Sequence, residues 1–177
     1  MKIELGLLEK KPFPKWEELP DIPLYMDQVI LLLEQALKVF IDEEKTITPA
    51  MVNNYVKHGL LSAPVKKKYD KKHVVILFII SVCKRVLSIN EIVAMTKALI
   101  EEWGEEKMYT LFCEKLEGAL QNVFLAGKIP EVPLNLKPDA LPALDAALIS
   151  LAGKLYVQSY VDNQEKEKMQ RKDDIEK

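Results

Sequence analysis

The chain has 177 residues, of which 49% are hydrophobic and 29% are charged, and its formal net charge is −2 at pH 7. This length allows one sizeable core, or two small subdomains that share one, and the composition excludes global disorder. The most apolar run, residues 74–83, is too short to cross a bilayer, and residues 1–16 lack the apolar stretch of a signal peptide. The two cysteines, Cys83 and Cys113, form no C-x-x-C pattern, which fits a reducing compartment. We therefore expect a soluble, cytoplasmic protein.

The charge is distributed unevenly along the chain. Residues 1–44 carry 5 basic and 10 acidic side chains, and residues 86–177 carry 11 basic and 16 acidic ones, so each block has a net charge of −5. Residues 45–85 carry 9 basic side chains and a single acidic one, Asp70, for a net charge of +8. Such a concentration is expected of a surface that binds a polyanion. The alternative is a lysine-rich loop that only keeps the protein soluble.

Prolines interrupt the start of the chain, so residues 1–23 are predicted to form an irregular N-terminal arm. Asp21 followed by Pro23 then marks the start of a helix. This helix, residues 24–41, ends at a predicted turn over residues 42–47. It carries apolar side chains on one face, at helical spacing: Met26, Ile30, Leu33, Leu37 and Phe40.

A short helix is predicted over residues 48–58. Thr48 is a favourable N-cap, and Pro49 suits the first helical position, where its missing N–H costs no hydrogen bond. Gly59 suits a left-handed cap at the C-terminal end. With the helix before it, this segment makes a helix-turn-helix candidate.

Tyr55 of this short helix is expected to be buried, because it shares the apolar face of Met51 and Val52. Asn54 lies one position earlier and is turned about 100° away, so its side chain is expected to be exposed.

Three helices are predicted in the middle of the chain. One begins at Asp70 and continues to about residue 86. The next covers residues 88–103, because Ser88 and Glu91 can form a capping box. A third covers residues 105–126, and at most a small β element is expected near residues 66–69.

The last helix is predicted to begin near residue 141, after a proline-rich connector over residues 128–142. Beyond residue 161 the chain loses nearly all apolar character, so residues 162–177 are expected to be a frayed or disordered charged tail. The apolar stripe of this helix has a 3-4-3-4 spacing and consists of Leu141, Leu144, Leu148, Leu151 and Leu155.

These elements predict an all-α protein with at most a minimal β wing. The predicted organisation is an arm over residues 1–23, a helix-turn-helix region over 24–103, a C-terminal helical bundle over 104–161 and the charged tail.

Residues 48–92 combine several short motifs in one order. Tyr-x-x-x-Gly-Leu-Leu covers residues 55–61, a basic stretch follows, a helix starts near Tyr69, and Ser-x-x-Glu-Ile covers residues 88–92. This order resembles the winged helix-turn-helix of MerR-type transcription regulators. The whole chain, especially "LPDIPLYMDQV" and "MVNNYVKHGLL", is also similar to an uncharacterised bacterial family known only as a domain of unknown function.

The MerR-like resemblance implies a transcription regulator that binds DNA through residues 48–58, with the lysine-rich wing on the phosphate backbone. The residue chemistry agrees, since an asparagine amide can bond N6 and N7 of adenine together, and lysines position a protein on phosphates. Either Asn53 or Asn54 is a candidate base reader. The predicted DNA-binding residues are Thr48, Asn53, Asn54, Lys57, His58, Lys66, Lys67 and Lys68.

The sequence favours a protein that is not an enzyme and has no cofactor. The only histidines, His58 and His73, have no cysteine or acid at metal-ligand spacing, and Cys113 lies in an apolar helix where a buried, inert thiol is expected. The acidic residues on either side of Gly104 indicate a helix boundary. The competing hypothesis is a helical protein–protein adaptor whose lysine patch binds an acidic partner.

The resemblance further implies a homodimer that pairs through the C-terminal helices. The leucine stripe that begins at Leu141 is one candidate seam, and its packing inside a single chain is the alternative. No set of residues indicates a pocket for a small-molecule effector.

Overall fold

The computed structural model describes residues 2–41, 47–132 and 139–175. The predicted turn over residues 42–47 therefore lies mostly outside the described residues, as does part of the connector over 128–142. In chain order the elements are β1 (Lys2–Ile3), α1 (Leu5–Leu8), η1 (Trp16–Glu18), α2 (Met26–Ala36), β2 (Phe40–Ile41), α3 (Pro49–Lys57), α4 (Lys71–Cys83), α5 (Ile89–Trp103), α6 (Glu105–Phe124) and α7 (Ala140–Ile175).

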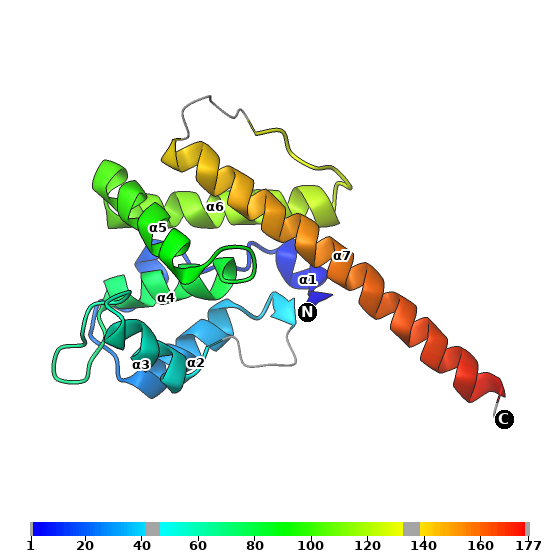
Figure 1. Cartoon of the computed structure of the whole chain (residues 1–177), viewed down its shortest axis with the longest axis horizontal. Coiled ribbons are helices and arrows are strands. Elements are labelled where there is room, and N and C mark those ends of the chain that lie inside the picture. The colour runs from blue at the N-terminus through cyan, green and yellow to red at the C-terminus, as the bar shows by residue number, and fades with distance from the viewer. Residues whose placement is uncertain (1, 42–46, 133–138, 176–177) are drawn as a thin grey trace.

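Helices dominate the described chain, which confirms the predicted all-α class. The two short strands β1 and β2 pair antiparallel, with Lys2 opposite Ile41 and Ile3 opposite Phe40. Figure 1 shows α2 and α3 at one end of the body, while α7 crosses α5 and α6 on the other side. The helix α4 lies between these two groups.

The helix α4 is the centre of the core. Ten of its 13 residues are buried, so it is covered on every side, as expected for a helix that is apolar all round. It contacts α2, α5 and α7. Its Phe78 makes edge-to-face contacts with the rings of Phe13, Tyr109 and Phe112, at centroid distances of 5.7, 5.8 and 6.1 Å.

The N-terminal segment is part of the core, which differs from the predicted irregular arm. Leu8, Phe13 and Leu19 are buried. The Tyr109 hydroxyl donates to the Pro14 carbonyl at 2.9 Å, and the Gln121 side-chain amide donates to the Leu8 carbonyl at 3.3 Å. The prolines therefore prevent a long helix, but apolar side chains spaced between them still hold the segment on α6.

The leucine stripe of α7 faces inward, which decides between the two alternatives. Leu144, Leu148, Leu151 and Leu155 are each at most 1% exposed and pack in the same core as α4. Across the α6–α7 contact, the Lys115 ammonium also donates to the Asp145 carboxylate at 2.7 Å. The stripe is thus an internal core face and leaves no seam for a second copy.

Among the described residues, one helix segment, 140–171, is long and apolar enough to cross a membrane when judged by length and composition alone. Its Leu144, Leu148, Leu151 and Leu155 are buried, and Asp145 within it is paired with Lys115. Packing in the core accounts for these four leucines.

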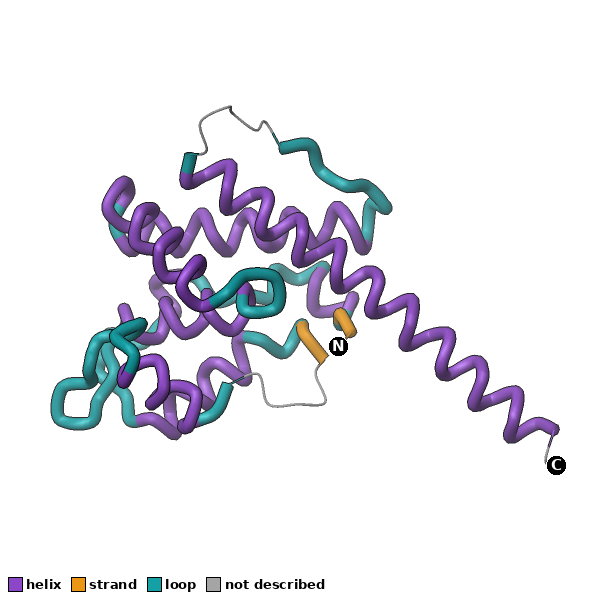
Figure 2. The backbone as a smooth tube through the Cα atoms, in the orientation of Figure 1, coloured by secondary structure: helices purple, strands orange, loops and turns teal. Residues whose placement is uncertain are grey.

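The charged tail is helical, in contrast to the predicted frayed or disordered end. α7 continues without interruption to Ile175, and its second half projects from the body (Figure 2). Most described side chains from residue 163 onward are exposed. Asp162 and Lys166, like Glu167 and Arg171, are spaced i,i+4 with the acid first, a pairing that favours helix even where no core stabilises it.

The inward packing of α7 makes a prediction for stability. Replacing the buried side chain in Leu148→Ala should lower the free energy of unfolding by about 2–5 kcal/mol, because a cavity is left in the core. Urea denaturation followed by circular dichroism measures this change. The matched control is Leu31→Ala, since Leu31 on α2 is 56% exposed and should change stability by less than about 0.5 kcal/mol. Equal effects of the two substitutions would contradict the packing.

Candidate nucleic-acid interface

Both ends of α3 are capped as the sequence predicts. The Thr48 hydroxyl accepts the Met51 N–H at 3.3 Å, and Pro49 occupies the first helical position. At the other end Gly59 has φ +69°, while the N–H groups of residues 60 and 59 donate to the carbonyls of residues 55 and 56. This is the Schellman arrangement, which needs a left-handed residue after the helix. The short helix therefore has defined limits.

The two faces of α3 also follow the prediction. Val52 and Tyr55 are buried at 0% and 6% exposure, and burial raises the pKa of the Tyr55 hydroxyl. Asn53 and Asn54 are exposed. Lys57 and the capping residue His58 are exposed as well. Thr48 is half-buried and is used by the helix cap.

The predicted wing is a two-residue hairpin turn, closed by an isolated β-bridge between Val65 and Lys68. Val65 and Lys68 exchange both backbone hydrogen bonds, at 2.9 and 3.1 Å. The two residues between them, Lys66 and Lys67, have φ values of +50° and +63°. Positive φ at both central positions is the mark of a type I′ turn, which usually requires Asn or Gly. The turn therefore holds two lysines in a conformation that costs free energy, and both are exposed.

The turn is attached to the start of α2. Leu24 and Tyr69 exchange backbone hydrogen bonds of 2.8 Å in each direction, which places Tyr25 beside the turn. The Lys68 ammonium lies 5.0 Å from the centre of the Tyr25 ring, and Tyr25 is 52% exposed. Sequence reasoning missed Tyr25, because nothing local links it to a turn more than forty residues away.

A buried histidine fixes the base of the loop to α4. His73 is 4% exposed, and its Nδ1 lies within hydrogen-bonding distance of both the Asp70 carboxylate and the Asp70 N–H. Its Nε2 lies 3.0 Å from the Ser62 hydroxyl and 3.2 Å from the Ser62 carbonyl. Burial alone would raise the pKa of Asp70, but hydrogen bonds from the His73 backbone and ring outweigh it, so this pKa lies below its usual 3.8. His73 is thus structural.

Ion pairs reduce the positive charge of residues 45–85. Lys71 pairs with Asp21, and Lys72 pairs with Glu105, so acids outside the block neutralise two of its lysines. Within the described part of the chain, no carboxylate pairs with Lys57, Lys66 or Lys67. The unpaired charge therefore gathers on α3 and the turn, which project from the same end of the molecule (Figure 1).

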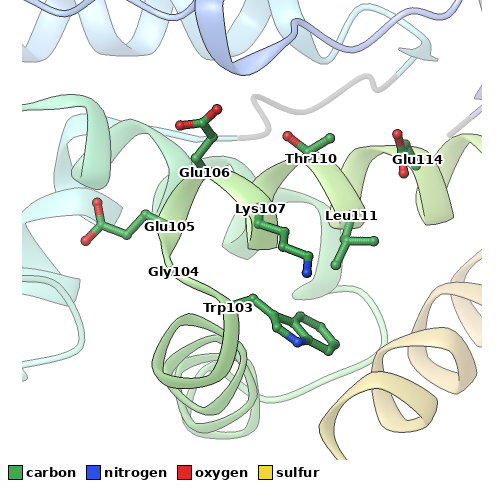
Figure 3. A pocket seen from close by; sticks show the side chains of 8 residues that line it. All are labelled: Trp103, Gly104, Glu105, Glu106, Lys107, Thr110, Leu111 and Glu114. Atoms are coloured by element: carbon green, nitrogen blue, oxygen red, sulfur yellow. The ribbon is translucent and has the colours of Figure 1, made fainter.

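The hollow at the α5–α6 junction, with a volume of about 580 Å³, has no catalytic arrangement. In Figure 3 the carboxylates of Glu105 and Glu106 point away from Trp103, and Lys107 lies next to that ring, 5.9 Å from its centre. Gly104 has φ +77° and separates the two helices. The acids in the first turn of α6 suit its N-terminal dipole, which agrees with the predicted helix boundary.

The described residues contain no group of three or more potential ligands that could hold a metal ion. Cys83 and Cys113 are both buried, and burial raises the pKa of each thiol to about 12. At neutral pH these thiols are therefore protonated and poor nucleophiles. The absence of enzymatic activity stays a prediction.

Comparison with protein families shows a match that includes α3 and the lysine turn. Residues 14–114 match the family described as a domain of unknown function, DUF1836. The chain belongs to the DUF1836 family. The DUF1836 match covers η1 through the first half of α6, so it includes α3 and the lysine turn but leaves α7 outside. No curated protein and no solved structure matches the chain.

The backbone strain in the turn gives a prediction that separates the effect of strain on stability from the effect of charge. Lys66→Asn combined with Lys67→Gly should raise the free energy of unfolding by about 1–2 kcal/mol, because Asn and Gly tolerate the left-handed conformation. Urea denaturation measures the gain. The control, Lys66→Gln with Lys67→Gln, removes the same two charges without relieving the backbone and should change stability by less than about 0.5 kcal/mol. If the two double variants are equally stable, the turn is not strained.

Proposed function

We propose that this protein is a DNA-binding transcription regulator of the MerR-like winged helix-turn-helix kind. The observation that carries the proposal is the pairing of an exposed, capped helix with a protruding lysine turn at one end of the molecule. α3 is the recognition helix, and the Val65–Lys68 turn is the wing. The remainder of the surface bears the net negative charge, so a polyanion is directed to this end.

The two parts of the interface have different chemistry. Asn53 and Asn54 expose carboxamides, which can donate to N7 and accept from N6 of one adenine in the major groove. Lys66 and Lys67 expose ammonium groups that suit phosphate oxygens and carry no base information. The Lys68 ammonium lies over the Tyr25 ring, so the third lysine of the turn makes a cation–π contact. Base reading therefore belongs to α3 and positioning to the turn.

The order of elements supports the winged helix-turn-helix interpretation. α2 contacts α3, the hairpin turn follows, and α4 then enters the core. The Leu24–Tyr69 bridge joins the wing to the chain just before α2. We expect such a protein to work in the cytoplasm, where it reaches DNA.

The salt dependence of binding tests the role of the turn. Each phosphate contact contributes a slope of about −0.9 to the plot of log affinity against log salt concentration. Replacing Lys66, Lys67 and Lys68 with Gln should make this slope less steep by about 2–3 and weaken binding to every sequence alike. Fluorescence anisotropy with a genomic and a scrambled fragment, each over a salt series, measures both effects.

A matched control removes three other lysines. Lys97→Gln, Lys128→Gln and Lys166→Gln change the net charge equally but lie on α5, after α6 and on α7. This triple variant should keep the parent slope. If the parent protein binds neither fragment at ~50 mM salt, where electrostatic binding is strong, DNA binding is excluded.

Base reading by α3 has a separate test. If Asn54 reads an adenine, Asn54→Ala should leave the salt slope unchanged but reduce the preference for that base pair by about 1–3 kcal/mol. Asn53→Ala is the matched comparison, because it removes the same amide from the neighbouring exposed position. Selection of bound fragments from random DNA identifies the preferred site, and competition binding with single-base variants measures the loss. Unaltered preference in both variants would remove α3 as the base reader.

The second candidate function is a helical adaptor that binds an acidic protein partner. Val65 and Ile22, on the turn and just before α2, are 73% and 71% exposed. Apolar side chains beside lysines suit a protein partner with acidic and apolar groups. This function becomes the leading one if the parent protein does not bind DNA in the anisotropy experiment.

A further inference from the structure

The helix α7 has a second apolar face, which its own chain leaves uncovered. Tyr156, Val157, Tyr160 and Val161 are 58%, 60%, 62% and 45% exposed. Their i,i+4 spacing places them together along one side of the helix. Buried Leu155 marks the opposite side, since Tyr160 is five residues further on and about 140° around the helix axis. This face lies outside the part of the chain that matches DUF1836.

The same face continues as small residues toward the start of α7. Ala143 and Ser150 are exposed, and Ala146 and Gly153 are half-buried. The complete outer stripe therefore follows a strict 3-4 repeat, small in its first half and large in its second: Ala143, Ala146, Ser150, Gly153, Val157, Tyr160 and Gln164.

A groove of about 520 Å³ opens beside Gly153. Its walls are mainly apolar and include Val123, Ile129 and Val157. Ile129 is 77% exposed. The groove thus widens the apolar face beyond the helix itself, onto the loop that follows α6.

Packing within the chain does not require the glycine at position 153. A Cβ atom built there would meet no atom within 4 Å, and φ of Gly153 is not positive. Glycine inside a helix lowers stability relative to alanine. The space at Gly153 is therefore open to a group from outside the chain.

We propose that this outer face of α7 binds the same face of a second copy, with the two helices antiparallel. A two-fold axis near residue 155 sets Val157 of each copy against Gly153 of the other. Tyr160 then faces Ser150, and Gln164 faces Ala146. Large side chains meet small ones along the whole contact, as close packing requires. A parallel pair would instead set Tyr160 against Tyr160.

Charge supports the antiparallel arrangement. In the same register Arg171 of one copy comes level with Asp139 of the other, and both side chains are exposed. Residues 162–171 carry three acidic and three basic side chains, so the projecting helices do not repel each other. An interface of this kind is isologous and closes after two copies.

The dimer goes beyond the proposed DNA binding and does not depend on it, so it is tested in the absence of DNA. Sedimentation equilibrium of the parent protein at ~10–100 μM should give a dimer. Ser150→Tyr should weaken the dimer by about tenfold or more, because two tyrosines then collide across the axis. Ser150→Tyr combined with Tyr160→Ser restores one large and one small residue at each contact and should recover most of the parent affinity.

Leu31→Glu is the control, because Leu31 is similarly exposed on α2 and should leave the dimer unchanged. Melting curves confirm that each variant is folded, which is expected since positions 150 and 160 are both exposed. A monomeric parent protein overturns the proposal. It is also overturned if Ser150→Tyr stays as tightly dimeric as the parent, or if the double variant is as weak as the single one.

Discussion

Burial of the apolar residues of α4 is the constraint on which the rest of the structure depends. A helix with apolar side chains all round is stable only when other elements cover every side, and here α2, α5 and α7 do so together with the N-terminal segment. Phe78 lies at the meeting point of rings from residues 13, 109 and 112. Asp70 is the N-cap of α4, so the same burial fixes the loop that carries the lysine turn, through the hydrogen bonds of His73 with Asp70 and with Ser62.

The ion pairs do not create the positive surface, but they confine its unpaired charge to α3 and the turn. Lys71 and Lys72 at the start of α4 bind acids from other segments, and the more exposed pair, Lys72 with Glu105, contributes only about 0–1 kcal/mol to stability. Their larger effect is on the distribution of charge, because they remove two positive groups next to the core and leave those of Lys57, Lys66 and Lys67. The turn adds backbone strain at the same place, an arrangement often found where a protein contacts a ligand.

The two ends of the molecule have different chemistry. The α3 end presents amides, lysines and Tyr25, whereas α7 presents leucines to the core and tyrosines and valines to solvent. One helix thus provides internal packing and an uncovered apolar face, on opposite sides. A protein that pairs through that outer face would carry two copies of the α3 end on one particle.

The sequence by itself determined the features that depend on residues within about one helical turn. The caps at Thr48, Asp70 and Ser88, the Gly59 stop and the buried and exposed faces of α3 all follow from local hydrogen bonding and helical spacing. Tertiary structure decided what depends on distant partners: the inward direction of the α7 leucines, the core position of the N-terminal segment, the acids that neutralise Lys71 and Lys72, and the place of Tyr25 under Lys68. The leucine stripe of α7 illustrates the physical reason. Its spacing suits a seam between two copies as well as a core face within one chain, and burial of the leucines against α6 decides for the core face.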